Sequence, residues 1–231
     1  MVQYSQLYSG QEFHDNPDDI ATSNAPQPPH GIYRRYLKRL LDILVVVLAA
    51  PFVLPLVLVL AAISARDGAG PFCVQDRVDR NGRTFRFWKL RTMVRDGDRR
   101  LAEYLASNPV ARAEWNETRK LENDPRITPM GKFMRKTALD ELPQLWNVLK
   151  GDMSLVGPRP LMPEQKALYP GPAYHRVRPG LTGLWRINGR KIRSFVRRSQ
   201  FDARYAERMS FPTDVLIILM TLRPVLRGSG V

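Results

Sequence analysis

Two adjacent carboxylates, Asp140 and Glu141, are the residues of this chain best suited to covalent chemistry. They follow a basic stretch that includes Arg135. A carboxylate beside a second acidic group that binds metal, with basic residues for phosphate oxygens, meets the needs of aspartyl-phosphate chemistry. The spacing Thr137-x-x-Asp140 also fits a helix capping box, in which Asp140 would only satisfy backbone donors. The sequence leaves both interpretations open.

Three rigid turns between residues 157 and 190 each carry an arginine. They are Gly157–Pro160, which holds Arg159, then Arg178–Gly180, and finally 188–190, which ends in Arg190. A stiff backbone lowers the entropy lost when an arginine binds phosphate, so the three turns together favour a diphosphate-bearing ligand. For any single turn, a solvated surface arginine is an equally good interpretation.

Several common functional classes lack their sequence signatures. Cys73 is the only cysteine, which excludes an internal disulfide, and three scattered histidines offer no set of soft zinc ligands. The chain contains no G-x-x-x-x-G-K-[ST], G-x-G-x-x-G, G-x-S-x-G or H-E-x-x-H pattern. Standard ATPase, dinucleotide, serine-hydrolase and zincin interpretations therefore lose their main support.

A β-hairpin is expected upstream of the Asp140–Glu141 pair. Residues 72–88 alternate apolar and polar side chains around Asn81-Gly82, a signal for a two-residue hairpin turn. Within residues 85–91, aromatic and basic side chains interleave. That pattern fits either a half-buried strand with a solvated basic face or a surface that stacks on nucleobases.

Helices are expected to position the acidic pair. Asn108 and Thr128, each followed by proline, mark two helix starts. A further helix is expected over 139–149, with Pro143 in its first turn and Gly151 as its stop signal.

An uncharged, mostly aliphatic run from Ile43 to Ile63 is the strongest single feature of the chain. At about 1.5 Å per residue it is long enough for a ~30 Å hydrocarbon core. Pro51 and Pro55 near its middle remove backbone donors and tend to kink a helix. Basic residues flank both ends, so charge gives no bias for sending either end outward. A plain spanning helix and a helix-break-helix that re-enters the cytoplasmic leaflet both stay open.

The charge is unevenly distributed along the chain. The net charge is +14, yet residues 1–30 contain no Lys or Arg and are expected to form a disordered acidic tail. The rest of the chain is strongly basic, which favours nucleic acid, an anionic membrane surface or phosphorylated substrates as partners. Residues 215–226 form a second apolar stretch, too short to span a membrane and suited to its interface. A membrane scaffold without catalysis explains the apolar run but not the ordered motifs.

Taken together, the motifs resemble the bacterial sugar transferase family, the monotopic phosphoglycosyl transferases, over roughly residues 38–231. In chain order they are Lys38-Arg39-x-x-Asp42, Lys89–Met93, Asp124–Thr128, Leu139–Leu145, Gly151–Pro160 and Arg178–Gly183. The resemblance implies a mainly α fold with a short β-hairpin, built as a membrane-associated monotopic domain. It divides the chain into the tail (1–30), a re-entrant membrane segment (31–66) and a catalytic domain with interfacial helices (67–231).

The resemblance also implies a reaction. Family members move a sugar phosphate from a UDP-sugar to a polyprenol phosphate such as undecaprenyl phosphate and release UMP, which begins exopolysaccharide or related glycan synthesis. Asp140 matches the family nucleophile, which forms a covalent phosphosugar intermediate. Glu141 matches the second acid of the pair, and both carboxylates are expected to hold the required Mg²⁺. The pattern looks closest to enzymes that transfer galactose phosphate or glucose phosphate.

Further site residues and partners follow from the same matching. The expected phosphate- and substrate-binding arginines are Arg91, Arg126, Arg135, Arg159 and Arg190. Pro55 matches the proline of the family's membrane break, with Pro51 as a second break, while Leu54 replaces the usual serine and Arg186 a usual glutamine. The expected location is the bacterial inner membrane, with the catalytic domain facing the cytoplasm. Membrane lipids, downstream glycosyltransferases and a second copy of the chain are the expected partners, and nucleic acid is not.

Overall fold

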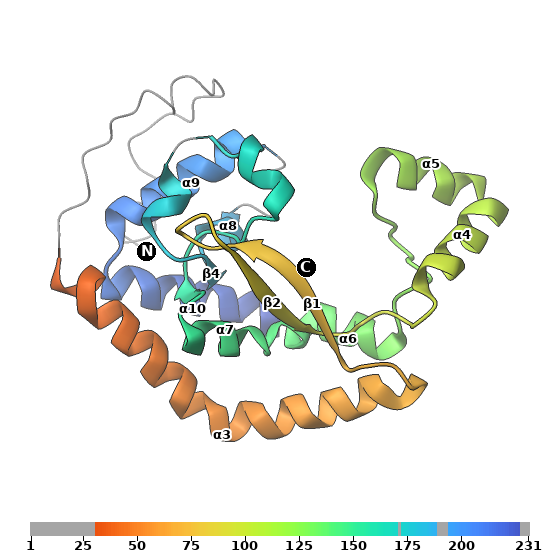
Figure 1. Ribbon diagram of the computed structural model, residues 1–231, viewed down its shortest axis with the longest axis horizontal. Coiled ribbons are helices and arrows are strands. Elements are labelled where there is room, and N and C mark those ends of the chain that lie inside the picture. The colour runs from red at the N-terminus through yellow and green to blue at the C-terminus, as the bar shows by residue number, and fades with distance from the viewer. Residues whose placement is uncertain (1–30, 171, 189–193, 227–231) are drawn as a thin grey trace. The chain divides into compact units, whose positions relative to one another are not determined.

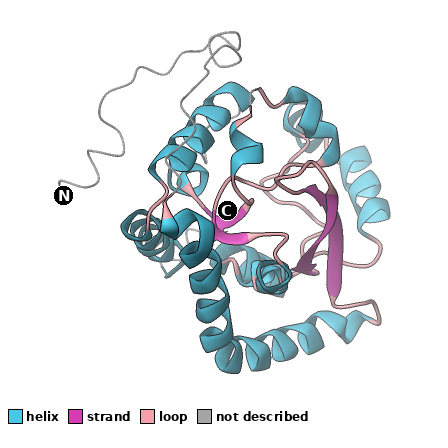
Figure 2. Ribbon diagram, turned by 60° about the vertical axis from the view of Figure 1, so that its left-hand side comes forward, coloured by secondary structure: helices cyan, strands magenta, loops and turns pink. Residues whose placement is uncertain are grey.

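The computed structural model describes residues 31–170, 172–188 and 194–226, so the acidic tail at 1–30 lies outside the described residues. Most of the described chain is helical, and its longest strands form one short hairpin (Figure 2). The expected fold class, mainly α with a short β-hairpin, is confirmed at that level.

The apolar run forms α3 (Lys38–Ser64), which follows a π-helical turn, η1 (Tyr33–Leu37), and ends in η2 (Ala65–Asp67). Helix α3 continues through Pro51 and Pro55, so the predicted break is instead a bend in an unbroken helix (Figure 1). A proline removes one backbone bond and pushes on the preceding turn, which bends a helix without ending it. Among the described residues, one segment, Tyr33–Asp67, is long and apolar enough to cross a membrane.

The hairpin pairs β1 (Phe72–Val78) with β2 (Thr84–Leu90). Its turn is longer than the two residues predicted, because Asp79 N–H donates to the Arg83 carbonyl across a loop of three residues. Gly82 ends that loop with a φ of 77°, a left-handed conformation that glycine adopts without steric cost. In β2, Phe85 and Phe87 are buried while Arg86 is exposed, the alternation of a half-buried strand.

Four helices follow the hairpin. They are α4 (Gly97–Ser107), α5 (Pro109–Thr118), α6 (Pro129–Thr137) and α7 (Gln144–Lys150). The predicted caps at Asn108 and Thr128 are confirmed, since the two side chains accept from the backbone N–H of Ala111 and Gly131. Gly151 ends α7 with a φ of 92°, as its stop-signal role requires.

The last part of the chain combines a two-stranded parallel pair with helices. Strand β3 (Ser154–Val156) pairs in parallel with β4 (Gly180–Thr182), and η4 (Pro163–Leu168) and η5 (Ala173–Arg176) lie between them in the chain. Helices α8 (Leu184–Asn188), α9 (Phe195–Arg208) and α10 (Phe211–Leu226) follow. Helix α10 starts before the apolar stretch predicted at 215–226 and continues to its end.

The described chain divides into two compact units. The first unit contains residues 31–42, 76–85 and 151–221, and the second contains 43–75, 86–150 and 222–226. In the first unit, Val78, Leu161 and Tyr174 form a buried cluster. In the second unit, one cluster centres on Leu90 and Met134, and α4 and α5 share a separate small one.

Candidate active site

The Asp140–Glu141 pair lies in η3 (Leu139–Glu141), a single turn between α6 and α7 in the second unit. Ala138, just before it, has a left-handed backbone with a φ of 56°, which ends α6 and starts the turn. Asp140 is only 7% exposed, and Glu141 is half-buried. A buried pair of acids needs nearby positive charge, because two ionised carboxylates so close together repel each other.

The capping-box interpretation of Thr137 and Asp140 is wrong. The Thr137 hydroxyl donates backward into α6, to the carbonyl oxygens of Phe133 (2.8 Å) and Met134 (3.3 Å). The helix predicted over 139–149 is also interrupted, because η3 and α7 are separate elements. The acidic pair therefore occupies a short turn and does not cap a long helix.

Lys89, at the end of β2, bridges the two carboxylates. Its Nζ lies 3.2 Å from Glu141 Oε1 and 3.8 Å from Asp140 Oδ2. The ammonium also lies 5.6 Å from the centre of the Phe87 ring, within range of a cation–π contact. One strand thus provides a fixed positive charge for both acids.

Burial is the main influence on Asp140 and raises the pKa of its carboxyl group. Lys89 opposes this effect most strongly, the charge of Glu141 raises the pKa further, and Arg135 lowers it. A carboxylate that is partly stripped of water is a stronger nucleophile than a solvated one, provided that it stays ionised. The two neighbouring cations favour that ionised form.

Arg135, in the last turn of α6, is held by Thr92. Its Nε donates to Thr92 Oγ1 at 2.9 Å, and the Thr92 carbonyl accepts from Thr128 N–H at 3.1 Å. The backbone of α6 approaches Thr92 so closely that a Cβ on Gly131 would lie 2.1 Å from the Thr92 carbonyl oxygen. Glycine is therefore required for this packing, which sets the position of Arg135. We call Lys89, Arg135, Asp140 and Glu141 the carboxylate cluster.

Two predicted arginines of the second unit are paired with carboxylates elsewhere. Arg126 binds Asp124 through two nitrogens, at 2.7 Å and 2.9 Å, and stacks on Trp115 with 5.1 Å to the ring centre. Arg91 donates to Asp67 at 2.7 Å and to backbone carbonyls near the end of α3. Both guanidinium groups organise the fold around them, and a phosphate-binding role for them stays a prediction.

The remaining predicted arginines do not belong to the second unit. Arg159 is an exposed residue of the first unit, and its guanidinium carbon lies 5.0 Å from the centre of the Trp185 ring. Trp185 is fixed in turn by a 3.1 Å hydrogen bond from its Nε1 to the Gly157 carbonyl. Arg190 lies outside the described residues.

Sequence reasoning did not assign Lys89 or Thr92 to the site. Both lie in the Lys89–Met93 motif, one of the motifs on which the family resemblance rests, so the motif indicated that this segment has a functional role. The hairpin pattern accounted for the segment as a strand, and nothing local indicates that its lysine meets residues some fifty positions later. Arg86 lies on the same strand and has the same charge, but its side chain is exposed. Charge and position in the strand therefore do not identify Lys89 as the residue that binds the acids.

A divalent cation fits the two carboxylates only with further ligands. Among the described residues, no group of three or more His, Cys, Asp or Glu side chains is placed to hold a metal ion. Mg²⁺ commonly binds one or two carboxylates and completes its shell with water and substrate phosphate oxygens. Asp140 and Glu141 provide oxygen donors of that kind, so this donor set suits Mg²⁺ bound together with a phosphorylated substrate.

Comparison with known proteins identifies a family that covers most of the chain. The family model described as "Bacterial sugar transferase" matches residues 33–228. An "Exopolysaccharide production protein ExoY" from Sinorhizobium fredii is 44% identical over 210 residues, which cover 90% of this chain and 92% of the relative. The match therefore extends over nearly the whole of both chains.

Two further relatives are longer proteins. A "UDP-galactose-lipid carrier transferase" from Erwinia amylovora is 44% identical and an "Undecaprenyl-phosphate galactose phosphotransferase" from Salmonella typhimurium is 43% identical, each over 198 residues. These alignments cover 85% of this chain but only 42% of each relative. The chain thus spans less than half the length of these two proteins.

Proposed function

Because the chain belongs to the bacterial sugar transferase family, we propose that it moves a hexose 1-phosphate from a UDP-sugar to undecaprenyl phosphate. The observation that carries the proposal is the carboxylate cluster, a buried acid beside a second acid with two cations in range. The names of two relatives favour galactose over glucose as the sugar. The product would be the first lipid-linked intermediate of exopolysaccharide synthesis.

In the proposed first step, an oxygen of Asp140 attacks the phosphorus that carries the sugar. The bond from that phosphorus to the bridging oxygen of the diphosphate breaks, and UMP leaves with the electron pair. Asp140 then carries the phosphosugar as an acyl phosphate. Burial makes the carboxylate reactive, and Lys89 and Arg135 favour its ionised form.

In the proposed second step, a phosphate oxygen of undecaprenyl phosphate attacks the same phosphorus. The bond to Asp140 breaks, the lipid-linked sugar diphosphate forms, and the carboxylate is restored. Bound by Asp140 and Glu141, Mg²⁺ would neutralise phosphate charge during both displacements. The motif matching adds Arg159 and Arg190 as phosphate-binding residues, which stays a prediction.

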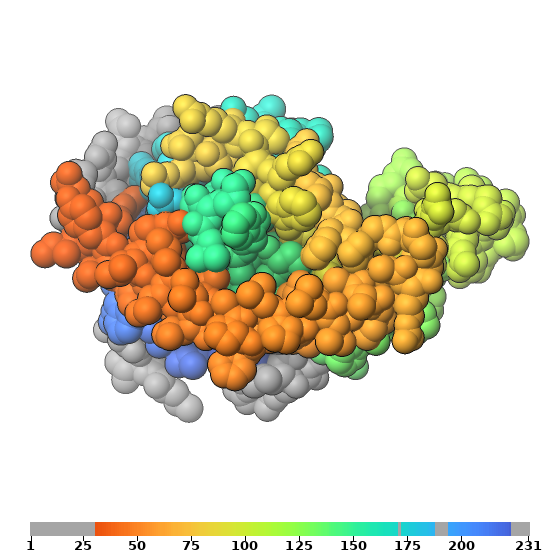
Figure 3. Space-filling view, turned by 60° about the horizontal axis from the view of Figure 1, so that its bottom comes forward, coloured from red at the N-terminus to blue at the C-terminus, as the bar shows by residue number. Residues whose placement is uncertain are grey.

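Membrane attachment is proposed through α3. Large apolar side chains of this helix are exposed, among them Leu48, Phe52 and Leu58, and Figure 3 shows its surface, in orange, uncovered on the side facing the viewer. We propose that α3 enters the cytoplasmic leaflet of the inner membrane and returns, with its bend at the deepest point. Labelling of cysteines introduced at residues 43 and 63 tests this, because ends that report from opposite sides of the membrane would contradict re-entry.

Product analysis tests the reaction itself. Detergent-solubilised protein is mixed with Mg²⁺, undecaprenyl phosphate and each of a panel of UDP-sugars, and the released nucleotide is identified. Release of UMP with one or two sugars is expected. Release of UDP would mean transfer of the sugar without its phosphate and would contradict the proposal, as would no nucleotide product with any sugar.

A further inference from the structure

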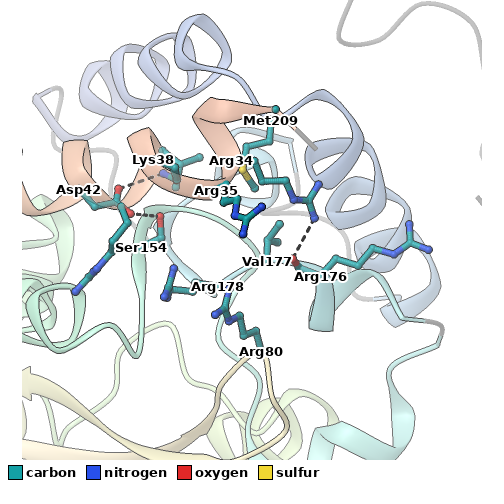
Figure 4. A pocket seen from close by; sticks show the side chains of 13 residues that line it. Arg34, Arg35, Lys38, Asp42, Arg80, Ser154, Arg176, Val177, Arg178 and Met209 are labelled. Carbon is teal, nitrogen blue, oxygen red and sulfur yellow. Dashed lines mark hydrogen bonds and ion pairs between the residues drawn. The ribbon is translucent and has the colours of Figure 1, made fainter. Parts of the chain in front are cut away.

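A cationic cavity of about 500 Å³ lies within the first unit (Figure 4). No residue of the carboxylate cluster is among the described residues that line it. Its lining comes from η1 and the start of α3, the hairpin turn, β3, and the segment that leads into β4. The basic residues that line it are Arg34, Arg35, Lys38, Arg39, Arg80, Arg176 and Arg178. Among the described residues that line it, Asp42 is the only acidic one.

That one carboxylate is already committed to internal bonds. Asp42 accepts from Lys38 Nζ at 3.1 Å, from Ser154 Oγ at 2.7 Å and from Leu155 N–H at 3.2 Å. Lys38 in turn lies 2.8 Å from Asp214 Oδ2. The lysine is therefore neutralised within the fold by two carboxylates.

Three of the cavity arginines have no acid partner among the described residues. Within the described part of the chain, no carboxylate lies at ion-pair distance from Arg35, Arg80 or Arg178. Figure 4 shows the guanidinium groups of these three residues pointing into the same space. Burial lowers the pKa of Arg178, and the charges of Arg80 and Arg39 lower it further. Such mutual repulsion is relieved when an anion enters.

Two arginine side chains of the cavity are already held by backbone carbonyls. Arg34 donates to the carbonyl oxygens of Ala206 (2.9 Å) and Arg176 (3.1 Å), and Arg178 Nε donates to the Gly151 carbonyl at 2.9 Å. Little conformational entropy is therefore lost when a ligand binds. Arginine forks of this kind suit the oxygens of a phosphate group.

The position of the cavity along α3 points to a lipid as the source of that phosphate. The apolar run starts at Ile43, directly after Asp42. Leu37 and Leu40, in the same unit as the cavity, are exposed at 43% and 61%, so this stretch presents apolar surface beside the arginines. A headgroup in the cavity would thus have apolar surface for its acyl chains close by.

We propose that the cationic cavity binds the phosphate of an anionic phospholipid headgroup, such as that of phosphatidylglycerol. The bound lipid would anchor the start of α3 at the membrane surface. This site is separate from the proposed transfer of sugar phosphate, and it takes a lipid that is not consumed.

Paired arginine variants test the proposal. Arg35 and Arg80 are exposed, and neither forms an ion pair with a carboxylate of the described residues. The double variant Arg35→Gln with Arg80→Gln should therefore leave the fold intact. The matched control is Arg83→Gln with Arg95→Gln, which removes two exposed charges outside the cavity. Short-chain phosphatidylglycerol is titrated into the detergent-solubilised full chain, and bound lipid is counted by native mass spectrometry. We expect about a tenfold loss of affinity in the cavity variant, as for a lost charge-assisted contact, and little change in the control.

Four results would overturn the proposal. Equal losses in the two double variants would indicate a general charge effect. Equal affinity of the unchanged protein for phosphatidylcholine and phosphatidylglycerol would show no preference for an anionic headgroup. Displacement of the lipid by inorganic phosphate at a similar concentration would identify a free phosphate as the ligand. A parallel rise in the KM for undecaprenyl phosphate in the cavity variant would instead assign the cavity to the substrate. If the double variant does not fold, Arg80→Gln alone, in an exposed turn, answers the same question.

Discussion

The carboxylate cluster and the cationic cavity are both strongly charged, but they balance their charges differently. In the carboxylate cluster two acids face two cations, and Lys89 contacts both acids. In the cationic cavity the described lining has seven basic residues and one acid, which is bound by Lys38. In a balanced cluster the cations offset part of the cost of ionising a buried acid, whereas an unbalanced cavity gains most when an anion enters. The first arrangement suits a reacting carboxylate and the second suits binding alone.

Asp140→Asn is expected to produce the largest effect. The amide cannot form the acyl phosphate, so turnover should fall by about 10⁴-fold or more and no labelled phosphosugar should stay on the protein. UMP release and protein-bound label from a radioactive UDP-sugar measure the two effects. Asp96→Asn, an exposed acid of the same unit, is the control and should keep full activity. Retained turnover in Asp140→Asn would refute the nucleophile assignment.

The same substitution should not weaken the fold. Because burial raises the pKa of Asp140 above its unfolded value, its stabilising contribution is full at low pH and is lost as pH rises through the folded-state pKa. Asn has no such dependence. The Tm of Asp140→Asn at neutral pH is therefore expected to equal or exceed that of the unchanged protein, so inactivity in this variant would not result from unfolding.

Lys89→Met unbalances the carboxylate cluster and should lower turnover at neutral pH by about tenfold to a hundredfold. Lys89 lowers the pKa of Asp140, so its removal raises that pKa further. The nucleophile must be deprotonated, and the limb where activity rises with pH is therefore expected to shift to higher pH. A pH–rate profile measures the shift, and Lys89→Arg, which keeps the charge, should restore most of it. A shift to lower pH would contradict this account of the cluster.

Thr92→Val removes the hydroxyl that holds Arg135 while keeping the shape of the side chain. We expect about a tenfold fall in kcat/KM, the order of one hydrogen bond to a charged group. Because Arg135 is positioned by Thr92, the loss should appear mainly in kcat. Thr92→Ser keeps the hydroxyl and should rescue activity. Equal activity of the Val and Ser variants would show that Arg135 does not need this contact.

Local signals in the sequence were sufficient for much of the fold. The caps at Asn108 and Thr128, the stop at Gly151 and the alternation in β2 depend on residues a few positions apart, and each was predicted. Local signals also misled where tertiary packing decided the outcome. The hydroxyl of Thr137 bonds backward into α6, and the prolines of α3 bend the helix without breaking it.

The candidate site was predictable only in part for the same reason. Asp140 and Glu141 are adjacent in the chain and were found from their types and motif. Lys89 reaches them only through folding, and the cavity arginines come from three separate segments, at 34–39, 80 and 176–178. The charge excess was visible in the composition, but its concentration around one cavity was not, because no local spacing indicates that Arg35, Arg80 and Arg178 line the same space.

Tyr205→Phe gives the counterpart of Thr92→Val in the first unit and should have the smallest effect. The buried Tyr205 hydroxyl lies 2.8 Å from Asp214 Oδ1 and 3.0 Å from the Val156 carbonyl oxygen. Asp214 keeps its ion pair with Lys38 after the change, so the loss of stability should be about 1–2 kcal/mol, measured by urea unfolding. Tyr104→Phe, whose hydroxyl makes only a long 3.4 Å contact, is the control. The Tyr205 hydroxyl supports the fold and contacts no reacting group. The kcat/KM of Tyr205→Phe should therefore stay within about twofold of the unchanged protein, against about a tenfold fall for Thr92→Val. A larger loss of turnover in Tyr205→Phe would mean that the first unit also sets the reaction rate, and the separation between a reacting and a binding region would fail.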